Sequence, residues 1–276
     1  VQYKGKPPIA ANPPWKGGFT WSKSKDGYPW VGVSCQANGA HLWYPSKEHP
    51  SDEPESAEIH ITVPKPLSVA SNGNLQSVKE HKNKWTTWHW STKYNINPYN
   101  INFTVGHFDL IERIIPSLEK PLKVQFYVLK ENLEGAQKLL DQVETFVDFF
   151  TRNFGQFPWI EEKLGIVNTP YFGMEHQTMI AYGNDYKKNE KGYDFLLFHE
   201  MAHEWWGNYL SVSDWSDFWI HEGFAVYCEA LYIEEKYGYE EYNSFLTKNI
   251  SKKIPLSKPI VLERYSTMSQ VFGLDP

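Results

Sequence analysis

Three segments in the first third of the chain alternate between apolar and polar residues, which is the period of a β-strand with one buried face. They cover residues 58–64, 84–92 and 101–108. In the second run, Trp88 and Trp90 share the apolar face, and His89 lies between them on the polar face. We interpret His89 as an ordinary strand histidine rather than a metal ligand. The pattern predicts an antiparallel β-rich part.

The pattern changes after a last alternating run at 122–129. From residue 132 to 153, large apolar residues recur at three- and four-residue steps, which predicts an amphipathic helix that Gly155 and Pro158 end. Further helices are predicted at about 194–209, 220–237 and 239–252. We therefore expect an α+β protein, with a β-rich domain over residues 1–116 and a mostly helical domain over residues 117–276.

Composition narrows the classes of function. The 276 residues are 41% apolar and 22% charged, as in a globular protein with a substantial core. The aromatic content of 16% is high, and such residues line substrate clefts as well as cores. The net charge of −6, without a cluster of Lys or Arg, argues against a nucleic-acid partner. No apolar run reaches the roughly 18 residues that a membrane span requires.

The N-terminal sequence and the cysteines bear on processing and compartment. The first residues, VQYKGKPPIA, contain neither an initiator Met nor the apolar core of a signal peptide. We therefore expect the chain to be a processed product or a piece of a longer protein. Cys35 and Cys228 are expected to be two buried, reduced thiols. The compartment stays open, with a soluble cytoplasmic location slightly favoured over export.

The segment FLLFHEMAHEWWGN carries candidate chemistry on a predicted helix. His199 and His203 are four residues apart, so on a helix they share one face with about 6 Å between their Cβ atoms. Both imidazoles can then reach one cation. Glu200 is rotated by about 100° from His199, so it can flank the ion and hold a water. This is the physical content of the His-Glu-x-x-His pattern, which predicts a metal site with its own base.

A catalytic zinc site needs a third protein ligand beside an open position. Glu222 lies near the start of the next predicted helix, and the eighteen residues between it and His203 suffice for a loop and a returning helix. His221 is the alternative, but neighbours on a helix point about 100° apart, so only one should face the metal, and we prefer Glu222. Asp214 and Asp217 are expected in the connecting loop, where they cap the next helix.

These motifs together resemble the M1 family of zinc aminopeptidases over nearly the whole chain. The resemblance is carried by the spacing of the three ligand positions, by WWGN after the second histidine and by DFWIHEGFA around the glutamate. GMEH at 173–176 is similar to the family's Gly-x-Met-Glu-Asn exopeptidase signature, and DEP at 52–54 is similar to a segment that follows its N-terminal sheet. The resemblance implies parts of two domains, an N-terminal antiparallel β domain and a mostly helical, thermolysin-like zinc peptidase domain.

The resemblance also implies an activity, the removal of N-terminal amino acids from peptides. One Zn²⁺ per chain is expected on His199, His203 and Glu222, in line with the geometry above. Glu200 is expected to act as the general base on a metal-activated water.

Recognition of the substrate is also implied by the resemblance, and the expected partners are peptides with a free N-terminus. Glu175 is the carboxylate expected to bind the α-ammonium group. The backbone of Gly173 and Met174 is expected to run along the peptide, where a glycine permits close approach. Gln36, in the segment SCQANG, occupies the position of a second amine contact.

The sequence departs from the family pattern at two places. His176 replaces the usual Asn after Glu175. The family's transition-state tyrosine lies in a Tyr-x-Lys-Gly segment, and nothing after Glu222 matches it, because Tyr265 has a different context. We therefore expect a fragment that lacks this tyrosine. Its loss can cost two to three orders of magnitude in rate, on the order of an oxyanion donor.

Two other functions stay open. One is a gluzincin endopeptidase, which has no free amine to bind, so the carboxylate at Glu175 argues against it. The other is a metal-binding protein without catalysis, whose mark would be a lost base or ligand. Glu200 and all three ligand positions are present, which favours an enzyme.

Overall fold

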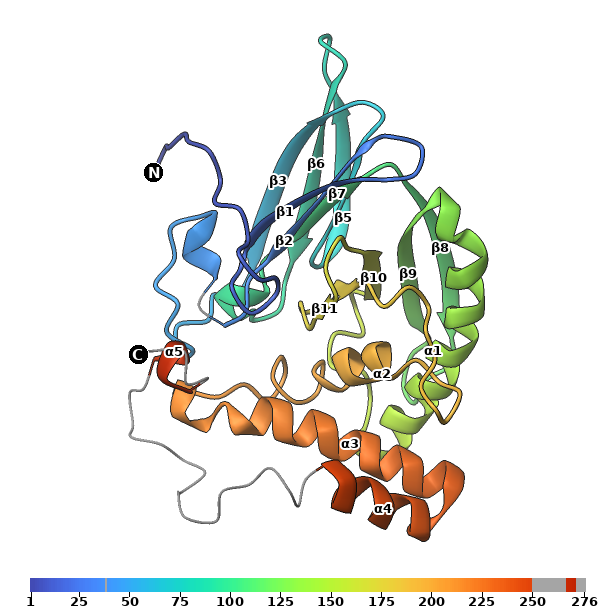
Figure 1. Cartoon of the computed structure of the whole chain (residues 1–276). Coiled ribbons are helices and arrows are strands. Elements are labelled where there is room, and N and C mark those ends of the chain that lie inside the picture. Colours follow the sequence, from blue (N-terminus) through green and yellow to red (C-terminus); the bar gives the residue numbers. More distant parts are fainter. Residues whose placement is uncertain (38, 250–266, 272–276) are drawn as a thin grey trace.

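The computed structural model describes residues 1–37, 39–249 and 267–271, and Figure 1 shows its sheets above a layer of helices. In these residues the strands are β1 (Gly18–Lys23), β2 (Pro29–Ser34), β3 (Ala57–Pro64), β4 (Ser68–Ser71), β5 (Asn74–Glu80), β6 (Trp85–Thr92), β7 (Phe103–Gly106), β8 (Phe108–Ile115), β9 (Leu122–Leu129), β10 (Leu164–Asn168), β11 (Gly173–Met174) and β12 (Ile180–Tyr182). The α-helices are α1 (Leu133–Phe154), α2 (Phe195–Ala202), α3 (Trp219–Tyr237), α4 (Tyr239–Asn249) and α5 (Met268–Val271).

The first part consists of two antiparallel sheets with strand orders β1-β2-β7-β4 and β3-β6-β5. Alternation places Ile59 and Trp90 on the inner face of the second sheet, where both are buried. The indole N–H of Trp90 donates to the backbone oxygen of Val69 in the first sheet at 3.2 Å. The α+β class and the antiparallel first part are thus confirmed, and the outer face of β3 and β6 is left toward solvent.

The second part is built on a five-stranded mixed sheet with the order β11-β12-β10-β9-β8. The three inner strands run parallel, and the edge strands β8 and β11 run antiparallel to their neighbours. Helix α1 lies against β8 and β9 (Figure 1), and its buried Phe146 and Phe150 share one core with Phe126 of β9. Strand β8 ends at Ile115, so this sheet contains strands from both sides of the domain boundary that we predicted near residue 116. The boundary itself stays a prediction.

The pattern predicted a single strand for the alternating segment 101–108, but the structure divides it between two strands. It contains β7, in the first sheet, and the start of β8, in the mixed sheet, so the chain passes from one sheet to the other at His107. Gly106 permits this step, because a Cβ there would lie 2.5 Å from Cζ of Phe108. Alternation alone cannot reveal such a switch, since the period continues on both sides.

The predicted helices at 132–153 and 220–237 are confirmed as α1 and α3, whereas the helix predicted over 194–209 is wrong at its C-terminal end. Helix α2 ends at Ala202, and the N–H of Asn208 turns back to the backbone oxygen of His203 at 2.9 Å. Gly207 has a φ of +126°, which a helix does not accept. The end predicted at residue 252 for the last helix lies outside the described residues.

A short loop between β4 and β5 connects the two parts of the molecule. The amide of Asn72 donates to the backbone oxygen of Gln177 at 2.6 Å, and the N–H of Gly73 donates to Thr178 Oγ1 at 2.8 Å. Lys163 is fully buried, and its ammonium group donates to the backbone oxygens of Ser71, at 3.1 Å, and of Gly73. The loop therefore provides the hydrogen-bond acceptors for the buried amine of Lys163, the residue just before β10.

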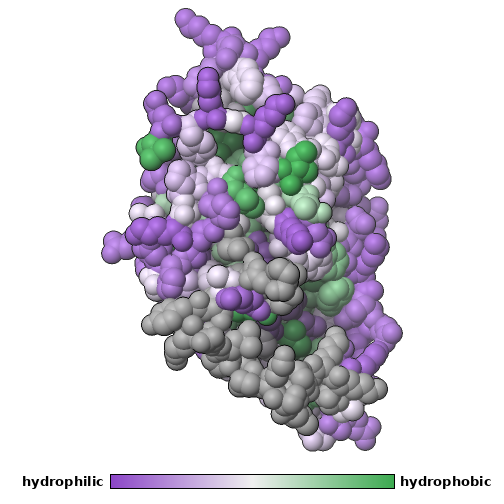
Figure 2. All heavy atoms as spheres, turned by 60° about the vertical axis from the view of Figure 1, so that its left-hand side comes forward, coloured by the Kyte–Doolittle hydropathy of each residue, from purple (hydrophilic) through white to green (hydrophobic). Residues whose placement is uncertain are grey.

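The cysteines and the surface agree with the expectations from composition. Cys35 and Cys228 are buried free thiols, as predicted, and burial raises the pKa of Cys228 to about 12. Among the described residues, no helix is both long enough and apolar enough to span a bilayer. The face seen in Figure 2 is largely hydrophilic, with scattered hydrophobic side chains.

Candidate metal centre

Helix α2 places the two histidines of the motif side by side. Its N-terminus is capped by Asp194, whose carboxylate accepts the N–H of Leu197 at 3.0 Å. One turn apart, His199 and His203 bring their Nε2 atoms to 3.2 Å from each other. His203 is buried and His199 is partly exposed, so the pair lies at the floor of an opening.

Glu222, in the first turn of α3, completes the group. Its Oε2 lies 3.3 Å from His199 Nε2, and its Oε1 lies 3.9 Å from His203 Nε2. One ligand atom from each of the three residues lies within 4.8 Å of the others. The returning helix thus brings Glu222 to the two histidines, although eighteen residues separate it from His203 in the sequence.

The opposite ring nitrogens of both histidines are held by other groups. His199 Nδ1 lies 3.0 Å from Glu229 Oε1, and His203 Nδ1 donates to the backbone oxygen of Trp206 at 3.0 Å. A carbonyl oxygen can only accept, so the proton of His203 is on Nδ1 and its Nε2 lone pair faces the group. Such support is typical of zinc-bound histidines, so the donor set fits zinc. Sequence reasoning missed Glu229, although it lies on the same face of α3 seven residues after Glu222.

The charges in this group favour a cation. Burial opposes ionisation of Glu222, but the hydrogen bond with His199 and the neighbouring imidazoles outweigh it and lower its pKa to about 2. Burial also lowers the pKa of His203 to about 4, so that its imidazole is neutral at pH 7. For His199, hydrogen bonds with Glu222 and Glu229 outweigh burial and raise the pKa well above its usual value. The carboxylates of Glu222 and Glu229 therefore favour a positive charge at His199.

Glu200 lies beside the ligands, on the side of the edge strand β11. Its carboxylate is buried, and burial together with the charges of Glu175 and Glu222 raises its pKa well above the usual value, although His199 opposes the shift. A Cβ on Gly173 would lie 2.8 Å from Glu200 Oε1, so a larger residue there would have to displace the Glu200 carboxylate. The base candidate thus packs directly against the strand expected to carry substrate.

Glu175 follows β11 and points into the same region. It is only 3% exposed, and Tyr99 from the first part of the chain donates its hydroxyl to Oε1 at 3.1 Å. Burial and the charge of Glu222 raise the pKa of Glu175 to about 7. Carboxylate oxygens of Glu175 and Glu200 and a nitrogen of His203 lie within 4.8 Å of one another. Asn208 of WWGN fixes the backbone by donating to the Glu175 carbonyl oxygen at 2.9 Å.

A cavity of about 540 Å³ opens over the metal ligands, within the range of sites for small ligands. All eight residues that the sequence assigned to metal, base or substrate line it, including Gln36 after β2 and Met174 of β11. Aromatic side chains that sequence reasoning did not assign also line it, namely Trp15, Phe172, Phe195 and Phe245. The structure therefore gathers the predicted site residues around one opening.

Other residues considered from sequence lie elsewhere. His221 is buried, and its Nε2 accepts the N–H of Val212 at 3.3 Å. Asp214 caps the short 3-10 helix Trp215–Asp217 instead of α3, by accepting the N–H of Ser216 at 2.9 Å. Both aspartates lie between α2 and α3, as predicted, but Asp217 belongs to that short helix and neither caps α3, so the predicted capping of α3 is wrong. Tyr265 lies outside the described residues.

His176, which stands where the family pattern has Asn, is a buried side chain. It is fully buried, and neither ring nitrogen has a hydrogen-bond partner among the described residues. Burial lowers its pKa to about 3, so the ring is neutral. It does not line the cavity, whereas Glu175 beside it does.

Comparison with known proteins gives concordant matches. The peptidase family M1 domain matches residues 139–273. Human glutamyl aminopeptidase is 30% identical over 213 residues, which cover 73% of this chain and 22% of that protein. The M1 zinc metallopeptidase from Deinococcus radiodurans superimposes with a TM-score of 0.67 at 19% identity, covering 84% of this chain and 52% of that chain. A mutant of that enzyme bound to a Tyr-Ser-Ala substrate gives a TM-score of 0.63 at 21% identity, covering 83% and 50%.

The chain spans about a fifth of the length of the curated relatives it matches and about half of the solved structures. The family domain includes the two histidines of α2 and the glutamate of α3, and the likeness of fold extends through both parts of the chain. On the domain match, the relatives and the shared fold, the chain belongs to peptidase family M1.

Proposed function

We propose that the protein containing this chain is a zinc aminopeptidase, which removes single residues from the N-terminus of peptides. The observation that carries the proposal is the buried carboxylate of Glu175, one oxygen of which lies within 4.8 Å of a carboxylate oxygen of Glu200 and a ring nitrogen of His203. A fixed carboxylate beside a metal and a base is what a substrate with a charged amine requires. It would have no purpose in cleaving the interior of a peptide.

His199, His203 and Glu222 would hold one zinc ion. When bound there, zinc supplies Lewis-acid chemistry, which polarises the scissile carbonyl and makes water more acidic. The residues fit this task, because Glu229 and the Trp206 carbonyl orient the two imidazoles so that their Nε2 atoms face Glu222.

Glu200 would be the general base. Its carboxylate takes a proton from the attacking water and returns it to the leaving amine. Burial raises the pKa of Glu200, which makes its carboxylate a stronger base than an exposed one.

The first part of the chain would help to bind the α-ammonium group. Tyr99 holds the Glu175 carboxylate in place, and Gln36 lines the cavity from the end of β2. The edge strand β11 pairs with β12 on one side only in the described sheet, which leaves a backbone edge where a peptide can lie.

The test compares aminoacyl p-nitroanilides with the same substrates blocked by N-acetylation, using the zinc-loaded protein that contains this chain. An aminopeptidase should favour the free amine by at least about tenfold, since the buried Glu175 loses its partner otherwise. Preference for blocked substrates would identify an endopeptidase instead. Bound zinc without cleavage of either substrate would identify a metal-binding protein without catalysis.

The role of Glu200 needs its own variant. Glu200→Gln should retain bound zinc and lose roughly 10²- to 10⁴-fold in kcat, the usual contribution of a general base. Glu190→Gln, which changes an exposed carboxylate that is 92% accessible, is the matched control and should change neither quantity.

A further inference from the structure

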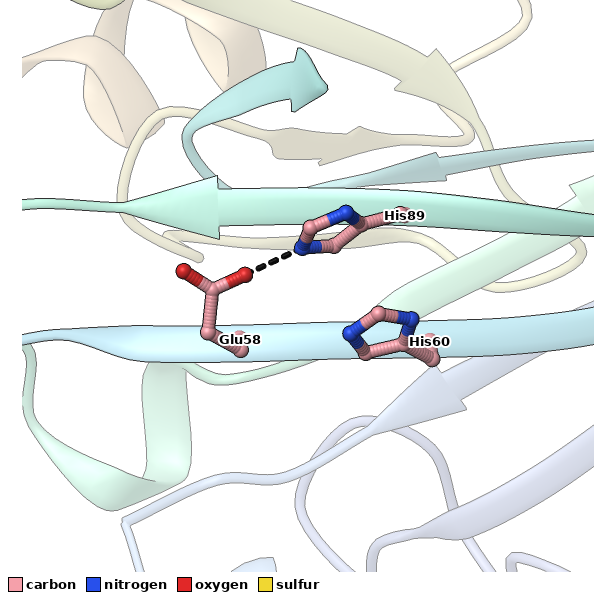
Figure 3. A group of neighbouring side chains, drawn as sticks. All are labelled: Glu58, His60 and His89. Atoms are coloured by element: carbon pink, nitrogen blue, oxygen red, sulfur yellow. Dashed lines mark hydrogen bonds and ion pairs between the residues drawn. The ribbon is translucent and has the colours of Figure 1, made fainter. Parts of the chain in front are cut away.

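A second group of potential metal ligands lies on the outer face of the β3-β6-β5 sheet. Glu58 and His60 are two residues apart on β3, and His89 lies on the neighbouring strand β6 (Figure 3). In the antiparallel register His60 is directly opposite His89, and Glu58 is opposite Ser91. Since side chains alternate along a strand, all of these point away from the core formed by Ile59 and Trp90.

The three side chains are already close together. One ligand atom from each lies within 4.8 Å of the others. The imidazole rings of His60 and His89 are stacked, with 4.0 Å between their centroids and 13° between their planes. His89 Nε2 donates to the Glu58 carboxylate, and Figure 3 shows the His60 ring alongside. The three side chains are partly or fully exposed, so they are free to rotate from the stacked arrangement toward a shared ion.

We propose that Glu58, His60 and His89 form a second metal site, which binds a divalent transition ion of the zinc and copper class, and this proposal replaces the interpretation of His89 that we drew from sequence alone. Two imidazoles and one carboxylate are a donor set that these ions prefer, whereas Mg²⁺ and Ca²⁺ prefer oxygen alone. None of the three residues lines the cavity over His199, so this site is separate from the peptidase centre and does not depend on the proposed peptidase reaction.

The surroundings support a ligand role for the carboxylate. Ser91 Oγ donates to Glu58 Oε1 at 2.9 Å, which orients the carboxylate and leaves Oε2 toward His89. The site is open, since the side chains of Glu58 and His89 are 60% and 27% exposed. Water would complete the coordination, and we expect weaker binding than at the buried centre.

The same contacts could also form an ion pair with a stacked ring and no metal, so the test must count ions. Equilibrium dialysis of the full chain against Zn²⁺ at micromolar concentration should give two equivalents per chain. The double variant H60Q/H89Q should bind one equivalent and keep the ion that resists brief treatment with a chelator. The reciprocal variant H199Q/H203Q should also bind one, which is the labile ion.

A matched control separates this site from ordinary surface histidines. His41 also contacts a single carboxylate, with 2.6 Å between its Nδ1 and Glu48 Oε2. Among the described residues, this pair is not part of a group of three potential metal ligands. H41Q should therefore retain two equivalents.

Glu58→Gln should retain the second site with an affinity reduced by at least roughly tenfold, because loss of a direct ligand should cost no less than loss of an outer-shell partner, which typically costs 10- to 100-fold. This variant keeps both histidines, so it tests the site even where H60Q/H89Q fails to fold. One equivalent in the unchanged chain, or a second equivalent that persists in H60Q/H89Q, would overturn the proposal. Wild-type affinity of Glu58→Gln would remove the carboxylate from it.

Discussion

Gly173 and Glu200 are in such close contact that a Cβ atom on residue 173 would lie 2.8 Å from Glu200 Oε1. The same Cβ would lie 2.8 Å from Leu196 Cδ1, so a side chain at residue 173 would press on two side chains of α2 at once. The position of the proposed base is thereby set by the absence of a side chain on the edge strand.

Gly173→Ala should consequently impair catalysis while zinc stays bound. A displacement of about 1 Å at a reacting group can cost 10²-fold, so we expect kcat/KM on an aminoacyl anilide to fall by about ten- to 100-fold. Metal analysis should show unchanged zinc. Gly5→Ala, where a Cβ would meet nothing within 4 Å, is the control. A rate near that of the unchanged chain would show that Glu200 tolerates the displacement.

Glu175→Gln should weaken binding of substrates with a free amine. A hydrogen bond to a charged group contributes about 1.5–3 kcal/mol, so kcat/KM for free-amine substrates should fall by roughly ten- to 150-fold. Tyr99→Phe removes only the donor that orients Glu175 and should have a smaller effect in the same direction. Kinetics on free and acetylated substrates measure both. An equal loss on the two substrates would contradict a role in amine recognition.

Glu229→Gln should weaken zinc binding without removing a ligand. The carboxylate contacts His199 Nδ1 at 3.0 Å, and loss of such support typically costs 10- to 100-fold in metal affinity. Competition with a chelating dye measures the change. Glu235→Gln is a control on the same helix, because Glu235 pairs with Arg152 at the surface. Unchanged affinity in Glu229→Gln would mean that His199 is oriented by other contacts.

His176 should make the fold sensitive to acid. Its pKa is about 3 in the folded protein and about 6.5 when exposed, so the unfolded chain binds the proton first as pH falls. Its contribution is complete above pH 6.5 and is lost as pH falls toward 3, at up to about 1.4 kcal/mol per pH unit.

His176→Asn should therefore flatten the decrease in unfolding free energy between pH 6.5 and pH 3, as measured by urea denaturation. Met179→Leu, a buried neighbour without a titrating group, can change the free energy of unfolding but should keep the slope. An unchanged slope in His176→Asn would show that other groups set the acid response.

Local pattern predicted much of the fold and of the metal ligands. The spacing of Leu139, Val143 and Phe146 predicted α1, because a helix with one buried face must repeat in this way. The offset of four between His199 and His203 predicted their meeting for the same geometric reason. The family resemblance and the chain length to the next helix together indicated Glu222.

What sequence could not give depends on contacts between distant segments. Helix α2 ends early because Glu204 turns inward, where it accepts the Thr178 N–H and the indole N–H of Trp159. The spacing of residues in the sequence can indicate that a residue is buried, but it does not show that its hydrogen-bond partners lie outside the helix. Tyr99 is 76 residues from Glu175 in sequence, so no local pattern could connect them. The short strands β10 to β12 are similarly defined by their neighbours in the sheet.

The loop at Ser71–Gly73 has a consequence for how the molecule unfolds. Separating the first part from the second would break the hydrogen bonds that the Lys163 amine makes to the backbone oxygens of Ser71 and Gly73, at a net cost of about 1 kcal/mol each. Neither part should therefore melt ahead of the other. Scanning calorimetry of the full chain should record one endotherm, with equal calorimetric and van't Hoff enthalpies. In thermodynamic terms the three sheets and the helices of the described residues are a single cooperative unit, joined at a buried lysine.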